Sequence, residues 1–228
     1  RDFPDPALLR RALDEVPFLV SLEVRSSEVS ERADVVLPVA PAVEKNGTYI
    51  NWEGRLRPFG QARSATSLTD RDVLVRLTEE FDDDLGVTAL SDLYAEVNAL
   101  MDWDGEPQEF AAVAPAAAPA LEPGRVLVAS HKPMIDAGRL QDGAPWLAGS
   151  ARRPVLLASA ATLARAGIAP GADATLETER GSITLPAAIG DLPDGVAWVP
   201  ECSVGSVLHE RLGGVGTVAT LRATQEVA

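Results

Sequence analysis

The chain has 228 residues, of which 46% are hydrophobic and 24% charged, a composition typical of a folded globular protein with one large or two small cores. Its 34 acidic and 20 basic residues give a formal net charge of −14, which repels phosphate backbones and anionic headgroups, so nucleic acid is not an expected partner. A single cysteine, Cys202, excludes an internal disulfide and a four-cysteine iron–sulfur cluster within these residues.

No stretch of the sequence has the length and apolarity of a membrane span. The longest apolar stretch, residues 110–121, is too short to cross a bilayer and is interrupted by Pro115 and Pro119. Residues 1–11 lack the apolar core of a signal peptide. We therefore expect a protein that is neither exported nor inserted directly into a membrane.

A helix and two strands are predicted at the start of the chain. Asp5-Pro6 provides an N-cap and a proline at the first helical position, which predicts a helix over about residues 6–15. Pro17–Val24 is a near-continuous apolar run, typical of a strand covered on both faces. Residues 26–32 are polar and lead into a second strand at Asp34–Leu37. This order predicts a parallel pair that enters a larger sheet part-way.

Turn signals dominate the segment that follows the second strand. Asn46-Gly47 is typical of a two-residue type I′ hairpin turn. Thr48–Trp52 is then the predicted return strand, and Glu53-Gly54 a second turn. A polar excursion after a strand is where open α/β sheets place their sites, although a surface hairpin with solvated charges explains the same residues.

Charged side chains in this excursion suggest one possible carboxylate pair. Glu44 and Glu53 would face each other across the predicted hairpin. Lys45 and Arg55 are equally well placed to neutralise them. We therefore assign no catalytic role to either carboxylate.

Two helices are predicted between residues 69 and 101. Thr69 and Asp72 have the spacing of a capping box. Apolar residues recur every fourth position to about Leu85, and Gly86 is expected to end this helix. The intervening run Asp82–Asp84 is expected to be a solvated corner. Ser91 is expected to cap the second helix, whose predicted inward-facing residues are Leu93, Val97, Leu100 and Met101.

The composition divides the chain into two domains. Between Asp102 and Gly124 it shifts to alanine and proline, which cannot pack a core and favour extended backbone. We predict an α/β domain at residues 1–105 that is incomplete at its N-terminus, a linker at 106–123, and a β-rich domain at 124–228.

The β-rich domain is predicted to be a small closed barrel. Several short strands with only two short helices favour closure, because closure removes exposed strand edges. The predicted strands are Arg125–Ser130, Pro154–Ala158, Ala174–Thr178, Ser182–Ile189, Val196–Val199 and Thr217–Leu221, and the predicted helices are Ser159–Ala166 and Val204–Leu212.

No arrangement of reactive side chains indicates an independent enzyme. Ser130 and His131 are adjacent and seldom point toward each other, so a triad is not expected. Gly213, Gly214 and Gly216 follow a predicted helix, whereas phosphate loops precede one. On one helix, Cys202 and His209 would lie roughly 10 Å apart, too far to share a metal ion. We predict no catalytic, cofactor-binding or metal-ligating residue.

Two segments carry a resemblance to a known family. Residues 31–59, ERADVVLPVAPAVEKNGTYINWEGRLRPF, resemble the molybdopterin-dependent oxidoreductases, in which an ADVVLP strand precedes E-K-x-G-T and N-x-E-G-R segments. Residues 163–189, LARAGIAPGADATLETERGSITLPAAI, resemble that family's C-terminal double-psi β-barrel, which closes over a molybdopterin dinucleotide. The resemblance implies the end of a Rossmann-like parallel-sheet domain followed by such a barrel.

Within that family, the closer likeness is to the large iron–sulfur subunits of respiratory complex I, the NADH-quinone oxidoreductases. Trp52 and the ending at residues 198–221, WVPECSVGSVLHERLGGVGTVATL, carry this likeness. It implies a preceding N-terminal part that binds iron–sulfur clusters. The implied partners are that part and the other peripheral-arm subunits, on the cytoplasmic side of the cell membrane.

Departures from the family pattern imply that the molybdopterin has been lost. Ala129–Met134 stands where cofactor-binding members have a T-G-R segment followed by residues that contact pterin and phosphates. Pro200–Ser203 replaces a longer cofactor-covering segment, and Glu201 would place a negative charge near a bound phosphate. The resemblance therefore implies a barrel that kept its fold without its ligand.

Three functions stay open. The first is a non-catalytic structural part of the large subunit of complex I, whose parent enzyme transfers electrons from NADH to quinone. The second is the C-terminal half of a molybdenum or tungsten enzyme, such as a formate dehydrogenase, that binds a molybdopterin dinucleotide. The third is a free-standing binding module that adopted the fold.

Overall fold

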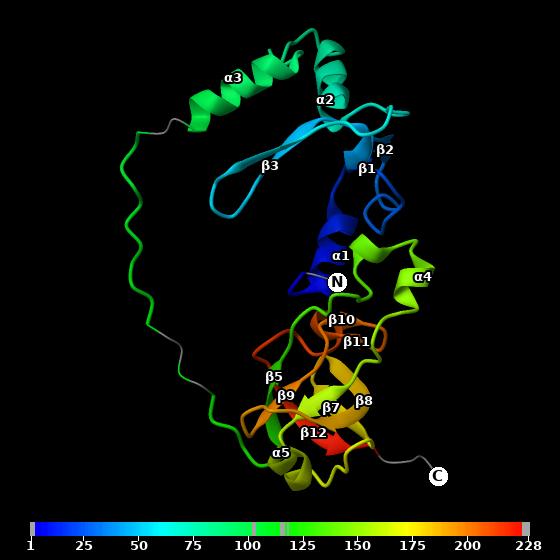
Figure 1. Ribbon diagram of the computed structural model, residues 1–228, viewed down its shortest axis with the longest axis vertical. Helices are drawn as coiled ribbons and strands as arrows, with labels where there is room; N and C mark the ends of the chain where they lie inside the picture. The colour runs from blue at the N-terminus through cyan, green and yellow to red at the C-terminus, as the bar shows by residue number, and fades with distance from the viewer. Residues whose placement is uncertain (1–2, 102–103, 115–116, 118, 225–228) are drawn as a thin grey trace. The chain divides into compact units, whose positions relative to one another are not determined.

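The computed structural model describes residues 3–101, 104–114, 117 and 119–224 (Figure 1). The chain divides into two compact units. One comprises Arg1–Ala12 with Pro115–Ala228 and contains the barrel; the other comprises Leu13–Ala114. Each unit is described separately below.

The first helix, α1, spans Pro6–Glu15, as predicted. Its N-cap is confirmed, because the Leu8 amide donates a 3.0 Å hydrogen bond to Asp5 Oδ1. This bond is the main reason that the pKa of Asp5 lies below its usual value, and Arg180, 3.6 Å away, lowers it further. The carboxylate therefore favours its charged form at the positive end of the helix.

The two predicted strands form a parallel pair. Strand β1 spans Val20–Glu23, β2 spans Val35–Pro38, and Val20 pairs with Val35. The expectation that the first strand is covered on both faces was wrong, because Val20 is 41% exposed and Phe18 63% exposed. Among the described residues this pair is a separate two-stranded sheet, so the Rossmann-like part of the predicted fold is not confirmed.

The hairpin in the next segment differs from the predicted one. A 3₁₀ turn, η1 (Ala42–Glu44), precedes strands β3 (Gly47–Ile50) and β4 (Leu56–Phe59), which pair antiparallel. Gly47 lies inside β3 instead of in a turn, so the Asn46-Gly47 prediction was wrong. The chain reverses at Asn51–Gly54, where Asn51 Oδ1 accepts hydrogen bonds from the Glu53 and Arg55 amides.

Glycine is required at position 47 for a different reason. A Cβ atom there would lie 2.5 Å from Phe59 Cζ, closer than carbon atoms can approach. The ring of Phe59 therefore packs directly against the backbone of its strand partner. At Gly54, by contrast, the φ of 77° is the left-handed conformation that the predicted second turn needs.

The two predicted helices are present with changed ends. Helix α2 spans Asp70–Glu79 and begins with the predicted capping box between Thr69 and Asp72. It ends well before Leu85, because Asp82 takes a left-handed conformation with φ of 55°, and carboxylates are unfavourable at a helix C-terminus.

Helix α3 spans Leu90–Met101, so Ser91 lies inside it and does not cap it. Asp92 instead accepts a hydrogen bond from the Ala89 amide. Leu100 and Met101 are exposed rather than facing inward, whereas Leu93 and Val97 are half-buried. Beyond the helix, residues 104–114 and 119–122 contain no helix or strand. Residues 115, 116 and 118 of the predicted linker lie outside the described residues.

A closed barrel in the order β12-β5-β9-β6-β8-β7 confirms the central prediction for the second half (Figure 1). Both parallel and antiparallel pairs close it: β5 runs parallel to β9, and β7 antiparallel to β8. The strands are β5 (Arg125–Ala129), β6 (Leu156–Ala158), β7 (Asp173–Thr178), β8 (Gly181–Ile189), β9 (Val196–Trp198) and β12 (Val218–Ala223).

The barrel encloses one apolar core. Leu156, Leu163, Leu176 and Leu208 are among its buried residues. Helix α5 (Ala160–Arg165) covers part of it, and the Ser159 hydroxyl accepts the capping hydrogen bond from the Thr162 amide, as predicted.

The predicted helix over Val204–Leu212 is only partly right. Its first half belongs to a tight antiparallel pair, β10 (Cys202–Ser203) and β11 (Ser206–Val207), and only Leu208–Arg211 is helical, as α6. Two further short elements, η2 (Arg139–Gln141) and α4 (Pro145–Ala148), were not predicted.

Candidate functional site

One candidate site is a pocket at an end of the barrel. It has a volume of about 570 Å³ and lies between the segment after β5, residues 150–155 and the end of β9. His131 and Trp198 lie within it with ring centroids 4.7 Å apart and planes tilted by 36°. Pro133, Pro154 and Pro200 also line it. Its lining is therefore largely apolar and poor in backbone donors, because proline has no N–H.

Two serine hydroxyls close to this pocket, though not in its lining, are used within the barrel. Ser130 Oγ donates a 2.7 Å hydrogen bond to the Val199 carbonyl. Ser206 Oγ donates a 2.6 Å bond to the Pro200 carbonyl from a fully buried position. These bonds fix the chain after β9 against its neighbours. Ser130 is thus positioned for structure and not as a nucleophile toward His131.

Glu201 also has a partner inside the fold. Its Oε1 lies 3.4 Å from His209 Nε2, and both side chains are mostly buried. Cys202 is buried on β10 while His209 lies on α6, so the single helix considered for them does not exist. Among the described residues, no group of three or more His, Cys, Asp or Glu side chains is arranged to hold a metal ion.

A second candidate site is the groove between the β3–β4 hairpin and helix α3. It has a volume of about 610 Å³. Thr48 and Tyr94 join its two walls through a 2.9 Å hydrogen bond between their hydroxyl groups. Lys45 forms an ion pair with Asp70 at the start of α2. These contacts hold the hairpin against the two helices that follow it.

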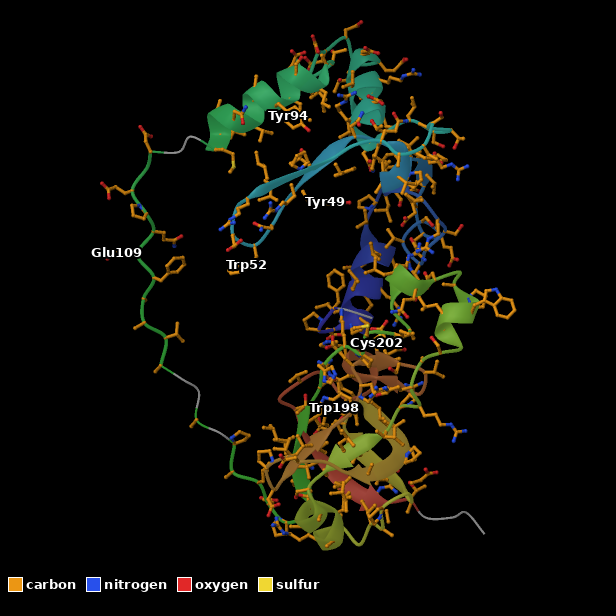
Figure 2. All side chains as sticks on the ribbon, in the orientation of Figure 1. Tyr49, Trp52, Tyr94, Glu109, Trp198 and Cys202 are labelled. Atoms are coloured by element: carbon orange, nitrogen blue, oxygen red, sulfur yellow. The ribbon has the colours of Figure 1, made fainter. Side chains whose placement is uncertain are left out.

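Aromatic side chains extend from this hairpin (Figure 2). Tyr49 and Phe59 stack with centroids 4.9 Å apart and planes 24° from parallel. Trp52 lies at the tip of the hairpin and is 93% exposed. Sequence reasoning missed the contact of Tyr94 with Thr48, because the two residues are far apart in the chain and no local pattern connects them.

Glu44 and Glu53, considered above as a carboxylate pair without a catalytic role, do not pair in the structure. Glu44 is 8% exposed and accepts hydrogen bonds of 3.2 and 3.3 Å from the amide and hydroxyl of Thr66. Glu53 lies 3.3 Å from Arg55. Each carboxylate therefore has its own structural partner, and neither is arranged for acid–base chemistry with the other.

Comparisons with known proteins place these features in a family context. The molybdopterin oxidoreductase family profile matches residues 2–69. The G subunit of NADH-quinone oxidoreductase from Mycobacterium tuberculosis is 43% identical over 92% of this chain and 27% of its own length. The corresponding Streptomyces coelicolor protein is 42% identical over 90% of this chain and 25% of its own. The chain thus spans about a quarter of the length of these two G subunits.

More distant relatives match part of the chain. The F420-dependent formate dehydrogenase subunit alpha of Methanocaldococcus jannaschii is 31% identical over 41% of this chain and 15% of its own length. Among solved structures, acetylene hydratase from Pelobacter acetylenicus has a TM-score of 0.54 at 15% identity, covering 94% of this chain and 41% of that one. This last likeness concerns the fold alone.

Proposed function

We propose that this chain has a structural role within an NADH-quinone oxidoreductase complex. The chain resembles the molybdopterin oxidoreductases and matches the G subunit of NADH-quinone oxidoreductases over 92% of its length. The chain is a non-catalytic portion of the large iron–sulfur subunit, in the peripheral arm on the cytoplasmic side of the membrane. The parent complex transfers electrons from NADH to quinone through other segments.

The observation that carries this proposal is the identity of 43% over 92% of the chain with the G subunit. It extends through both the hairpin segment and the barrel, whereas the formate dehydrogenase relative matches 41% of the chain. No helix of the described residues has the length and apolarity to cross a membrane. The expected partners are the iron–sulfur part of the same subunit and the neighbouring peripheral-arm subunits.

The barrel pocket is a poor fit to a molybdopterin dinucleotide. A pyrophosphate needs several donors that converge on it. Three prolines, which have no N–H, line this pocket, and the two arginines of its lining, Arg152 and Arg153, are exposed. Trp198 lies against His131 inside the same space. These observations support loss of the cofactor, with the barrel retained as a structural module.

The test uses the intact complex purified from its source. We expect iron–sulfur subunits to co-purify with the full-length subunit, and molybdenum, tungsten and oxidised pterin to be far below one per molecule. Metal analysis and pterin fluorescence after oxidation measure this directly. Stoichiometric molybdenum or tungsten together with pterin would contradict the proposal.

A second function has one observation in its favour. Arg152 and Arg153 line the rim of the barrel pocket, and guanidinium groups bind phosphates well. The chain would then be the C-terminal half of a molybdopterin-dependent oxidoreductase related to formate dehydrogenases. The same metal and pterin analysis separates the two functions, because only this second one requires the cofactor.

A further inference from the structure

The β3–β4 hairpin carries an exposed surface of aromatic and basic side chains. We define the hairpin surface as Tyr49, Trp52, Arg55 and Arg57. Tyr49 pairs directly with Arg57 across the two strands. Tyr49 is 61% exposed and Trp52 is 93% exposed. Trp, Tyr and Arg are the residue types that contribute most to protein–protein binding energy.

An open apolar groove adjoins the hairpin surface. Leu93 and Val97 of α3 line one wall, and Ile50 and Leu56 of the hairpin line the other. Helix α3 has no buried residue, although an amphipathic helix in a globular protein normally buries its apolar stripe. A partner that entered this groove would cover apolar surface that the described residues of this unit leave in contact with solvent.

The hairpin and the residues that flank it carry a charge opposite to that of the chain as a whole. Residues 47–59 contain two basic residues and one acidic one, and Lys45 and Arg63 beside them add two more bases, in a chain with a net charge of −14. Only the Lys45–Asp70 and Arg55–Glu53 pairs place a carboxylate beside these bases in the described structure. A complementary surface would therefore be acidic.

We propose that the hairpin surface and the groove beside it dock an acidic segment of another subunit, which inserts apolar side chains between the hairpin and α3. That the partner belongs to the same complex rests on the proposed function. A second copy of this chain, whose residues 79–84 are also rich in carboxylates, is an outcome that the first experiment distinguishes.

The first experiment is photo-cross-linking in the assembled complex with full-length subunit. Trp52 is replaced by p-benzoylphenylalanine, and Trp146, which is 92% exposed on the barrel unit, is replaced in the same way as a matched control. We expect position 52 to cross-link to one peptide of another subunit, rich in carboxylates, with a yield at least five times that at position 146. Cross-links to any other part of the same subunit, including residues 104–114 and the part outside this chain, to a second copy, or at equal yield from both positions would overturn the proposal.

The second experiment tests the charge. Arg57→Glu is expected to lower the position-52 cross-link about tenfold, as expected for loss of an interface hot spot. Arg211→Glu, a charge reversal at an exposed arginine of the barrel unit, should change it less than twofold. Replacing the carboxylates of the cross-linked peptide by lysine should restore the yield with Arg57→Glu. An unchanged yield with Arg57→Glu would contradict the docking geometry.

Failure of this inference is distinguishable from failure of the proposed function. Co-migration of the unmodified subunit with the NADH-oxidising subunits tests the function alone. If it co-migrates and position 52 gives no inter-subunit cross-link, the docking surface is wrong and the structural role stands. If it cross-links to an acidic subunit of a different complex, the docking surface stands and the proposed function is wrong.

Discussion

The barrel and the unit at Leu13–Ala114 differ in how many apolar side chains they bury. In the barrel, six strands pair in a closed ring around one core. In the other unit, the described strands form two separate two-stranded sheets, and the buried hydrophobic residues among those described are Val39, Ala40 and Val75. Two-stranded sheets are marginally stable alone. The barrel therefore has the means to stabilise itself, whereas the described residues of the other unit bury few apolar side chains.

The two units also differ in net charge. Of the 34 acidic and 20 basic residues in the whole chain, 21 acidic and 8 basic residues lie within residues 13–114. The barrel unit is thus close to neutral, and the unit with little core is strongly acidic. Mutual repulsion within the acidic unit opposes compaction, and its basic hairpin stands out against this background.

The largest expected effect comes from the barrel core. Leu176 is fully buried, so Leu176→Ala should lower the free energy of unfolding of the barrel by about 2–5 kcal/mol. Leu77→Ala, at a 45% exposed position on α2, is the matched control in the other unit and should cost about 1 kcal/mol or less. Urea unfolding followed by hydrogen exchange of β7 and α2 amides measures both. Equal losses of unfolding free energy in the two variants would show that the two units bury apolar side chains to the same effect.

A smaller effect is expected where the chain leaves β9. Ser206→Ala removes the buried hydrogen bond to the Pro200 carbonyl and leaves that acceptor unsatisfied, at a cost of about 1–3 kcal/mol. The same unfolding measurement applies. Ser182→Ala, at an exposed position on β8, is the control and should change stability by less than about 0.5 kcal/mol.

The hairpin gives a smaller effect again. Tyr94→Phe removes the hydroxyl that bonds Thr48 and should cost about 0.5–1.5 kcal/mol of local stability, because the bond is only part-buried. Tyr49→Phe removes a hydroxyl from a 61% exposed side chain and is the control. Hydrogen exchange of the β3 amides should accelerate only with Tyr94→Phe. No change in exchange would mean that the bond does not hold the hairpin against α3.

The smallest effect concerns pH and the surface of the barrel unit. The Ser159 hydroxyl, and then Arg165, hold the pKa of Asp194 below its usual value. A carboxyl whose pKa is lowered on folding contributes stability above its unfolded pKa and loses it as pH falls through the folded value. Asp194→Asn should therefore reduce the dependence of the urea midpoint on pH below about 4. An unchanged dependence in the Asp194→Asn variant would contradict a lowered pKa of Asp194 in the folded barrel.

Sequence reasoning succeeded where local chemistry decides the structure. The caps at Asp5, Thr69 and Ser159 depend on side chains within three residues, and all three are confirmed. The barrel strands were predictable because dense valine and leucine runs alternate with turn residues. The parallel β1–β2 pair was predicted from the order of a strand, a polar connection expected to be helical, and a strand, and the pairing is confirmed.

Some errors were local, such as the cap assigned to Ser91, and others lie where distant residues decide. Asn46-Gly47 has the sequence of a tight turn, but Gly47 is occupied in pairing with Phe59. Val204–Leu212 has helical spacing, but Cys202 and Ser203 pair with its first residues and restrict the helix to Leu208–Arg211. The hydrogen bond between Thr48 and Tyr94 could not be predicted from either segment alone.

The ring of Phe59 over Gly47 gives the glycine of the E-K-x-G-T segment a meaning of its own. Even a methyl group at position 47 would collide with that ring, and the ring would have to swing away and release Tyr49, its stacking partner. The absence of a side chain at Gly47 therefore determines where the rings of Phe59 and Tyr49 lie. The Asn46-Gly47 pair, which has the sequence of a turn, instead leaves the space that the ring of Phe59 occupies.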